Sequence, residues 1–361
     1  MRRLYALSVF IPIAVVLDLT GAPATAVFFT SALGLVPTAV LMSDATEHLA
    51  ARSGPGIGGI VNVTFGNAPE LIIAFFALVD GLQEVVKASL VGSVIGNSLL
   101  VLGAAMLAGG WRRERQRFSP LAAERVARLL LVAVVALVLP ALLELAFGGG
   151  HLPRVDEERH HYGGWVEGVS LAVAGGLAAY YLIRLITSIR GRHGIFELAP
   201  DDLDEDSEVW SATRSVVLLA IAGVLVGVMS EVLVGSIEDA SHAVGLSPFF
   251  IAVFVVGIAG NAAEHWVAVV VAIKDKMDLS LNIALGSSVQ IAMFLVPALV
   301  LLSLLVGPHP MALVFNGYEV VALASAGLVS TVVTRGGQST RGEGALLIAV
   351  YVALGVVFAI A

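Results

Sequence analysis

Two short polar inserts interrupt long apolar runs of the sequence, and they restrict the possible folds more than any other feature of the chain. Residues 66–70 read Gly-Asn-Ala-Pro-Glu, and residues 260–264 read Gly-Asn-Ala-Ala-Glu, 194 residues later. The same offset brings the Gly-Ser pair at 92–93 into register with the pair at 286–287. A gap-free correspondence of this length predicts two copies of one structural unit.

The composition restricts the environment in which such a unit can fold. Of the 361 residues, 58% are hydrophobic and only 13% are charged, and the mean hydropathy is +0.94. These values predict an all-α polytopic membrane protein. The chain has no cysteine, which excludes disulfides and thiolate metal sites. The net charge of −8 comes largely from one acidic block at residues 197–208, so it does not indicate a nucleic-acid partner.

Apolar stretches of membrane-spanning length predict eleven transmembrane helices. Their expected limits are 4–20, 23–51, 57–79, 86–110, 121–147, 165–189, 211–243, 247–273, 279–307, 310–334 and 343–361. The first run is interpreted as a retained helix rather than a signal peptide, because apolar sequence follows it. With the N-terminus inside, 17 of the 20 basic residues fall in cytoplasmic loops, which predicts a cytoplasmic N-terminus and an outside C-terminus.

The two inserts fall in the third and eighth spans, so the helices that carry them should cross the membrane in opposite directions. We therefore expect two inverted five-helix repeats after one N-terminal helix, a construction common in secondary transporters. The predicted parts are an N-terminal helix (1–22), a first repeat (23–190), an acidic cytoplasmic linker or helix (191–210) and a second repeat (211–361). The linker is interpreted either as a solvated spacer or as a segment that attracts or senses cations.

Each insert places a carboxylate where the helix backbone is interrupted. An acidic residue at the membrane centre costs about 2.5–3.5 kcal/mol, so Glu70 and Glu264 should face a cavity or a partner. Pro69 has no N–H to donate and Gly66 weakens the same turn, which frees backbone carbonyls beside Glu70. The structural alternative is a kinked helix with a satisfied, buried glutamate.

Amide side chains beside the glutamates complete an oxygen-rich set. Asn67 and Asn261 each precede the glutamate by three residues, which on a helix places amide and carboxylate on one face, and Gly260 repeats Gly66. Two carboxylates, two amide oxygens and backbone carbonyls suit Ca²⁺, with the two glutamates as metal ligands. Protons compete for the same oxygens, because the buried carboxylates repel each other. Such a site predicts an exchanger that moves at least two protons per ion.

Further polar residues lie in the fourth and ninth spans. They are Ser89, Ser93, Asn97 and Ser98 in the fourth span, and Ser287, Ser288 and Gln290 in the ninth. We expect Ser93, Ser287 and Gln290 at or near the ion, although small and hydroxylated residues also serve helix packing. His265 follows Glu264 and has no counterpart in the first repeat. It is a candidate proton relay or gate, or else a hydrogen-bonded structural histidine.

Acidic residues near the ends of the second and seventh spans form a candidate access path. Asp44 and Glu47 belong to the second span, and Glu231 and Glu238 belong to the seventh. We interpret them as gating residues or as a vestibule that guides cations. Solvated helix ends are the alternative, and it is weaker for Glu47 and Glu231, which lie inside apolar runs.

These motifs together resemble the Ca²⁺/H⁺ exchanger (CAX) family of the cation/calcium exchanger superfamily. The resemblance rests on the two inserts, on Gly92-Ser93, on the Gly-Ser-Ser-Val-Gln run at 286–290 and on the acidic linker. It implies eleven helices, Ca²⁺ held between two inverted repeats by the insert glutamates, and export of cytosolic Ca²⁺ driven by inward protons. Sodium/calcium exchangers are similar in architecture but carry a Thr-Ser pair where Asn67-Ala68 stands. Pro69 departs from the Ala or Thr common in the CAX family, which affects local helix geometry and ion selectivity.

Three alternatives remain open at this stage. The same scaffold could exchange Na⁺ for Ca²⁺, or Mn²⁺ or another divalent ion for protons. An intramembrane metalloenzyme built on His48, Glu264 and His265 is disfavoured because no His-Glu-x-x-His pattern exists. A passive channel is disfavoured because two buried glutamates should hold a divalent ion too tightly for rapid conduction. The expected partners are Ca²⁺, H⁺ and the lipid bilayer of a prokaryotic inner membrane, with no cofactor and an undetermined oligomeric state.

Overall fold

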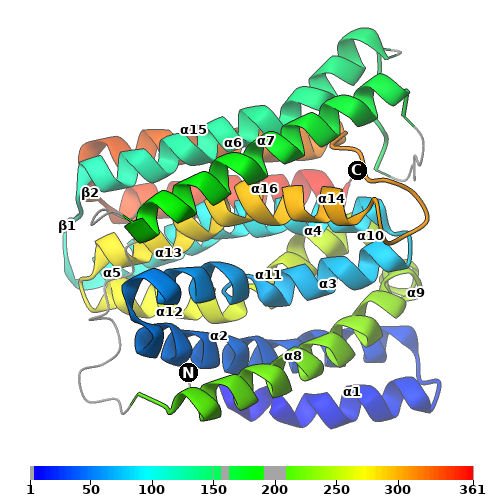
Figure 1. Ribbon diagram of the computed structural model, residues 1–361, viewed down its shortest axis with the longest axis horizontal. Helices are drawn as coiled ribbons and strands as arrows, with labels where there is room; N and C mark the ends of the chain where they lie inside the picture. Colours follow the sequence, from blue (N-terminus) through cyan, green and yellow to red (C-terminus); the bar gives the residue numbers. More distant parts are fainter. Residues whose placement is uncertain (1–3, 149, 156–161, 191–208, 361) are drawn as a thin grey trace. The chain divides into compact units, whose positions relative to one another are not determined.

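The chain folds into helices that form two compact units, as seen in a computed structural model that describes residues 4–148, 150–155, 162–190 and 209–360. Figure 1 shows how nearly all of these residues are helical. The first unit comprises Met1–Phe76, Tyr180–Gly245 and Ala259–Ala263, and the second comprises Ala77–Ala179, Leu246–Ile258 and Glu264–Ala361. The acidic linker predicted at 191–210 lies outside the described residues up to position 208.

The first unit is built from long helices that pack side by side. Its elements are η1 (Leu4–Val9), α1 (Phe10–Leu19), α2 (Ala24–Phe65), α8 (Ala212–Gly235) and α9 (Ile237–Val244). α1 and α8 both pack along α2 (Figure 1). A Cβ atom at Gly34 of α2 would lie only 2.9 Å from Sδ of Met229, so glycine allows α8 to approach at this point. Ser211 begins α8 by accepting a hydrogen bond from the backbone N–H of Arg214 (3.2 Å).

The helix boundaries in the first unit differ from the predicted spans. α2 is assigned through Phe65, but Gly54, with φ of +76°, breaks its helical path between the predicted limits at 51 and 57, so the predicted break between the second and third spans is present. Glycine adopts this left-handed conformation without steric cost. The helix then stops at the first insert, and α3 (Ala68–Val79) begins. The predicted span 211–243 divides at Ser236, whose hydroxyl donates to the carbonyl oxygens of Val232 and Leu233.

The second unit contains the remaining helices. Its elements begin with α4 (Gln83–Ile95), η2 (Gly96–Val101), α5 (Leu102–Gly109), η3 (Gly110–Arg112), β1 (Gln116–Arg117), α6 (Pro120–Phe147) and, later in the chain, α10 (Pro248–Ile251) and η5 (Ala252–Val256). They continue with α13 (Met277–Gln290), η6 (Ile291–Leu295), α14 (Val296–Leu302), α15 (Gly317–Val333), η7 (Thr334–Gly336), β2 (Gln338–Ser339) and α16 (Arg341–Ala359). Four helices have residues in both units. They are α3, α7 (Gly164–Arg190), α11 (Gly257–Gly260) and α12 (Ala262–Ile273). β1 and β2 form a short antiparallel pair.

The element boundaries repeat at the offset seen in the sequence. α3 and α12 each have 12 residues and start 194 positions apart, and α4 and α13, with 13 and 14 residues, also start 194 positions apart. Both α4 and α13 continue into a π-helical segment, η2 and η6 respectively. The turns before them also correspond, because Gly81 and Asp275 both have positive φ, +82° and +67°. The repeated sequence therefore folds into repeated local structure.

Eight of the described helices are long and apolar enough to span a membrane, and they coincide with eight of the predicted spans. The other three predictions, 4–20, 57–79 and 247–273, correspond to shorter or broken helices. One bent pair, Ile237–Val244 with Pro248–Gly260, turns by 109° and would make a ninth span if it crosses as one unit. The breaks in the third and eighth predicted spans fall at the polar inserts.

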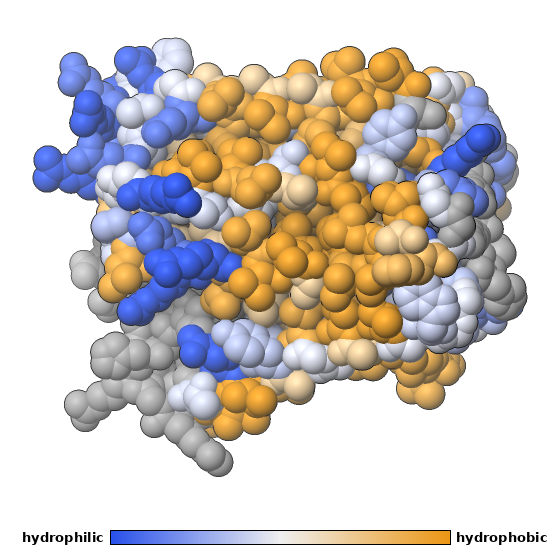
Figure 2. Space-filling view, turned by 90° about the horizontal axis from the view of Figure 1, so that it is seen from above, coloured by the Kyte–Doolittle hydropathy of each residue, from blue (hydrophilic) through white to orange (hydrophobic). Residues whose placement is uncertain are grey.

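The exposed surface is that of an integral membrane protein. Figure 2 shows one face of the molecule, on which hydrophobic residues fill the middle and hydrophilic residues gather toward the ends. Val132 and Val135 of α6 and Val332 of α15 are each at least 60% exposed. A continuous apolar surface of this kind is costly in water and stable in lipid.

Candidate ion-binding site

The first insert separates α2 from α3 by a glycine-dependent break. The N–H of Gly66 donates to the carbonyl oxygen of Asn62 (2.7 Å), and a Cβ at Gly66 would lie 2.5 Å from that oxygen. Asn67 stands at the start of α3, where its carbonyl oxygen accepts the N–H of Leu71 (3.1 Å). The spacing between Asn67 and Glu70 suggested that both lie inside one helix. Instead, Asn67 stands immediately before the first residue of α3.

Glu70 lies in the first turn of α3 and is almost fully buried, with 6% of its surface exposed. The N-terminal end of a helix carries partial positive charge, which favours a carboxylate there. Pro69 is the second residue of α3, a position where the missing N–H has no intrahelical partner to lose. The Pro-Glu pair thus favours the start of a helix and places the carboxylate of Glu70 in the first turn of that helix.

The first glutamate packs against the second insert. A Cβ at Gly260 would lie 3.4 Å from Cγ of Glu70 and 3.4 Å from Cδ1 of Ile73. Asn67 and Asn261 are both buried in the same unit, with 6% and 1% of their surfaces exposed. The first unit therefore contains both asparagines, both insert glycines and one of the two glutamates.

The second glutamate lies in the corresponding helix α12 and belongs to the second unit. Glu264 lies in the first turn of α12 and accepts a hydrogen bond from the side chain of Ser287. Its Oε2 atom is buried and has no hydrogen-bond partner among the residues that the structure describes. An oxygen of this kind is available to a cation or a proton.

Asn97 connects Ser287, which bonds to Glu264, to the neighbouring His265. Its Nδ2 donates to Oγ of Ser287 (3.1 Å), and its Oδ1 lies 2.9 Å from Nε2 of His265. With the amide in this orientation Oδ1 must accept, so Nε2 of His265 carries the proton. The donors then run in one direction, from His265 through Asn97 and Ser287 to Glu264.

The π-helical segments place these side chains. Asn97 is the second residue of η2, and Gln290, which is buried, immediately precedes η6. Single π-helical turns are often found at functional sites because they redirect side chains. The backbones also approach closely here, since a Cβ at Gly257 would lie 3.0 Å from the backbone nitrogen of Ser93. Ser93 is itself buried at this crossing.

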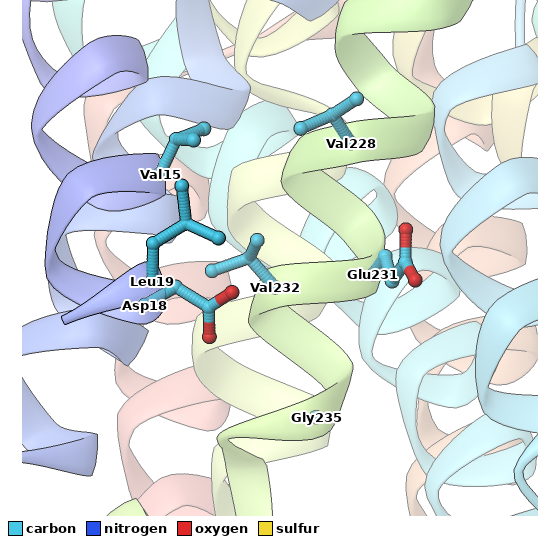
Figure 3. Close-up of a pocket in the computed structure, with 7 residues that line it drawn as sticks. All are labelled: Val15, Asp18, Leu19, Val228, Glu231, Val232 and Gly235. Carbon is cyan, nitrogen blue, oxygen red and sulfur yellow. The ribbon is translucent and has the colours of Figure 1, made fainter. Parts of the chain in front are cut away.

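The four acidic residues predicted to gate access all lie in the first unit, in different surroundings, whereas His265, the other gating candidate, lies in the second. Asp44 accepts a hydrogen bond of 2.7 Å from the hydroxyl of Tyr5, and Glu47 is half-buried on the same helix. Glu231 is exposed and lines a pocket of about 350 Å³ between α1 and α8 (Figure 3). Glu238 is exposed in the first turn of α9. The structure thus gives these four residues no shared site.

Asp18 is a carboxylate that sequence reasoning missed. It lines the same pocket as Glu231, but Figure 3 shows the two side chains on different sides of α8. The sequence signal for it was weak, because Asp18 ends a short apolar run next to a turn, where acidic residues are common.

Asn97 was one of several polar candidates in the sequence, and the structure gives it the central hydrogen-bonding position among them. By contrast Ser98 donates to the carbonyl oxygen of Val94 in its own helix (2.6 Å), which is ordinary helix chemistry. Among the described residues, no three His, Asp or Glu side chains form a metal centre. Any cation held here would depend on amide, hydroxyl and backbone oxygens as well as carboxylates.

The fold and the two glutamate-bearing helix breaks define a polytopic membrane transporter. A family model for the sodium/calcium exchanger protein matches residues 23–190 and 214–360, and the chain belongs to this family. Membership assigns the chain to transporters rather than to enzymes and confirms the predicted family resemblance.

Several known proteins are similar to the chain over nearly its whole length. A protein of Synechocystis sp. named Ca(2+)/H(+) antiporter is 41% identical over 371 residues, covering 98% of this chain and 95% of that protein. The Ca(2+)/H(+) antiporter ChaA of Bacillus subtilis is 37% identical, with 96% of each chain covered. The structure of native YfkE matches with a TM-score of 0.83 at 34% identity, covering 99% of this chain and 100% of that one. The H+/Ca2+ exchanger CAX shares the fold, with a TM-score of 0.73 at 16% identity and coverage of 99% and 91%.

Proposed function

We propose that the chain is a secondary active antiporter that exports cytosolic Ca²⁺ in exchange for protons by alternating access. Its family membership and its relatives named Ca(2+)/H(+) antiporters support the choice of Ca²⁺ and H⁺ as transported ions. We place it in the inner membrane of a prokaryotic cell, with a cytoplasmic N-terminus and an outside C-terminus, on the distribution of basic residues.

The observation that carries the proposal is the equivalent placement of the two glutamates. Each lies in the first turn of a 12-residue helix that follows a Gly-Asn break. A helix break leaves carbonyl oxygens without intrahelical partners, and such ends coordinate cations in transporters built from discontinuous helices. We also propose that the two glutamates share one site, as expected for equivalent residues of two inverted repeats.

The proposed architecture is one N-terminal helix followed by two inverted five-helix repeats, eleven helices in all. The equal offset between α3 and α12 and between α4 and α13 supports two copies of one unit. Within this arrangement the repeats would comprise residues 23–190 and 211–361, joined by the acidic segment 191–210. Inverted repeats allow one site to open alternately to either side of the membrane.

Exchange follows from competition for shared oxygens. Two carboxylates balance one Ca²⁺, and without the ion they bind protons, since burial and like charge disfavour two bare carboxylates. Asn67, Asn261 and Gln290 supply neutral oxygens to the ion, and Ser93 and Ser287 supply hydroxyl groups. His265 holds Asn97 in place and shields the site. Asp44, Glu47, Glu231 and Glu238 act on the access path.

Purified protein in proteoliposomes tests this function directly. An imposed proton gradient should drive Ca²⁺ uptake, and uptake should stop when a protonophore dissipates the gradient. A sodium gradient alone should drive none, and Ca²⁺ should compete with Mn²⁺ in the proton-driven assay. Uptake driven by sodium would favour the alternative of Na⁺/Ca²⁺ exchange, and uptake without any gradient would indicate a channel.

A further inference from the structure

A buried ion pair lies at the beginning of α4, away from the candidate ion site in the sequence. Lys87 is only 2% exposed. Its Nζ atom lies 2.5 Å from Oε1 of Glu84 and donates to the carbonyl oxygen of Val314 (2.7 Å). One carboxylate therefore already balances the lysine charge. Charged groups inside a membrane-spanning segment are costly unless they are paired in this way.

A second carboxylate faces the same pair from α15. Glu319 is fully buried, and its Oε2 atom accepts the backbone N–H of Asn316 (2.8 Å), which makes a capping box at the start of the helix. Its other oxygen, Oε1, is buried and has no hydrogen-bond partner within the described part of the chain. Lys87 attracts the Glu319 carboxylate electrostatically and Glu84 repels it.

Within the part of the chain that the structure describes, Lys87 is the cation that acts on the carboxylate of Glu319. The phenol of Tyr162, just before α7, interacts electrostatically with Lys87. α6 also packs against α15, and its one fully buried charged residue is another carboxylate, Glu144. Among the described residues of this cluster, the single cation Lys87 thus faces two carboxylates, Glu84 and Glu319. One negative charge would be left uncompensated in an apolar interior, with an oxygen that makes no hydrogen bond.

We propose that Glu319 holds a proton at neutral pH and forms a second protonation site, separate from Glu70 and Glu264. The proton makes the cluster of Glu84, Lys87 and Glu319 neutral and removes the cost of a bare, unsatisfied carboxylate oxygen. This proton is not cargo, because Ca²⁺ is exchanged for protons on the insert glutamates. This second protonation site goes beyond the proposed antiport activity, and only its distinction from the transported protons rests on that proposed function.

The neutral cluster holds a buried, non-helical segment in place. Residues 311–315 precede α15 and are all at most 3% exposed, although they form no regular secondary structure. Lys87 binds the carbonyl oxygen of Val314, and Nε2 of Gln83 donates to the carbonyl oxygen of His309 (2.6 Å). Loss of the Glu319 proton at alkaline pH would charge the cluster and weaken this attachment.

Infrared spectroscopy of the purified full-length protein with saturating Ca²⁺ tests the proposal, since Ca²⁺ displaces the protons of the transport glutamates. We expect a protonated carboxyl stretching band to remain in the wild type at neutral pH and to vanish in Glu319→Gln. It should also vanish in Glu84→Gln, because Lys87 then balances an ionised Glu319. Absence of any such band from the Ca²⁺-loaded wild type would overturn the proposal without reference to a variant.

Two further variants locate the proton. Glu343→Gln removes an equivalent capping-box glutamate at α16, whose Oε2 accepts from the N–H of Thr340 (2.8 Å), and it should leave the band unchanged. Glu144→Gln should also leave it unchanged, and loss of the band there instead would place the proton on Glu144 and contradict the proposal. Thermal unfolding gives a second readout, because raising the pH should lower the Tm of the wild type relative to that of Glu319→Gln. Equal shifts in both would count against the site.

Discussion

Cγ of Glu70 lies 3.4 Å from the position that a Cβ atom would take on Gly260. The carboxylate-bearing side chain of the first insert thus packs directly on the glycine of the second insert. Gly260 does not have positive φ, and a Cβ there would make only ordinary van der Waals contact with Glu70, so crowding begins with side chains larger than alanine. A larger side chain at this position would therefore act on the site through Glu70.

A valine at position 260 should displace Glu70 and weaken Ca²⁺ binding. Overpacking of a filled interior costs about 1–3 kcal/mol, so we expect the apparent Kd for Ca²⁺ to rise roughly tenfold or more in Gly260→Val. Gly176→Val in α7 is the matched control, because no atom lies within 4 Å of a Cβ built there. Equilibrium Ca²⁺ titration of both purified variants makes the comparison, and equal affinities would show that the contact has no effect on the site.

Replacing Asn97 by alanine should weaken Ca²⁺ binding by releasing Ser287 and His265 from their positions. Loss of one buried hydrogen bond costs about 1 kcal/mol, which corresponds to roughly a fivefold rise in apparent Kd. Ser98→Ala removes a hydroxyl from the adjacent position, and it should change little because that hydroxyl bonds only within its own helix. A pH profile of transport gives a second readout. Movement of Ser287 and His265 beside Glu264 should shift this profile. An unchanged profile together with an unchanged Ca²⁺ affinity would show that Asn97 only packs.

The insert asparagines should contribute to Ca²⁺ binding but not to proton binding. Asn67→Ala and Asn261→Ala each remove one neutral oxygen from the ion while both glutamates remain. We expect weaker Ca²⁺ affinity in each variant and a proton titration of the glutamates close to that of the wild type. Parallel Ca²⁺ and proton titrations measure both. Unchanged Ca²⁺ affinity in both variants would indicate that the amides are structural.

The pH dependence of Ca²⁺ binding follows from competition at the same oxygens. Acidification protonates the glutamates and removes the charges that balance the ion, so the apparent Kd for Ca²⁺ should rise as the pH falls. If two protons compete with one ion, the limiting slope is about 100-fold per pH unit. Isotherms recorded from about pH 6 to 8.5 test this. A Kd that does not change over that range would argue against direct competition.

Most of the membrane helices could be predicted because their signal is local. Apolar length alone predicted the eight long helices, and the repeated inserts predicted where α3 and α12 begin. The break at Gly54 was predicted in the same way, since the second span was expected to end near 51 and the third to begin near 57.

Contacts between distant segments were beyond sequence reasoning. Nothing in the sequence pairs Asn97 with His265, 168 positions apart, or Lys87 with the carbonyl of Val314, 227 positions apart. Apolar periodicity reports which positions are buried, but not which polar groups meet inside. The buried glutamate at 319 also resembled an ordinary helix start, because Asn-x-x-Glu is a capping-box pattern.

The most direct test of the account measures Ca²⁺ and proton fluxes together in proteoliposomes for Glu70→Gln and Glu264→Gln. Each change removes one of the two charges that balance Ca²⁺ and one of the proton carriers. We predict that either variant loses both coupled fluxes, while Glu343→Gln, away from the inserts, stays within about twofold of the wild type. The wild type should move at least two protons for each Ca²⁺. Near-normal exchange by Glu70→Gln or by Glu264→Gln would contradict the central claim that both glutamates carry the ions.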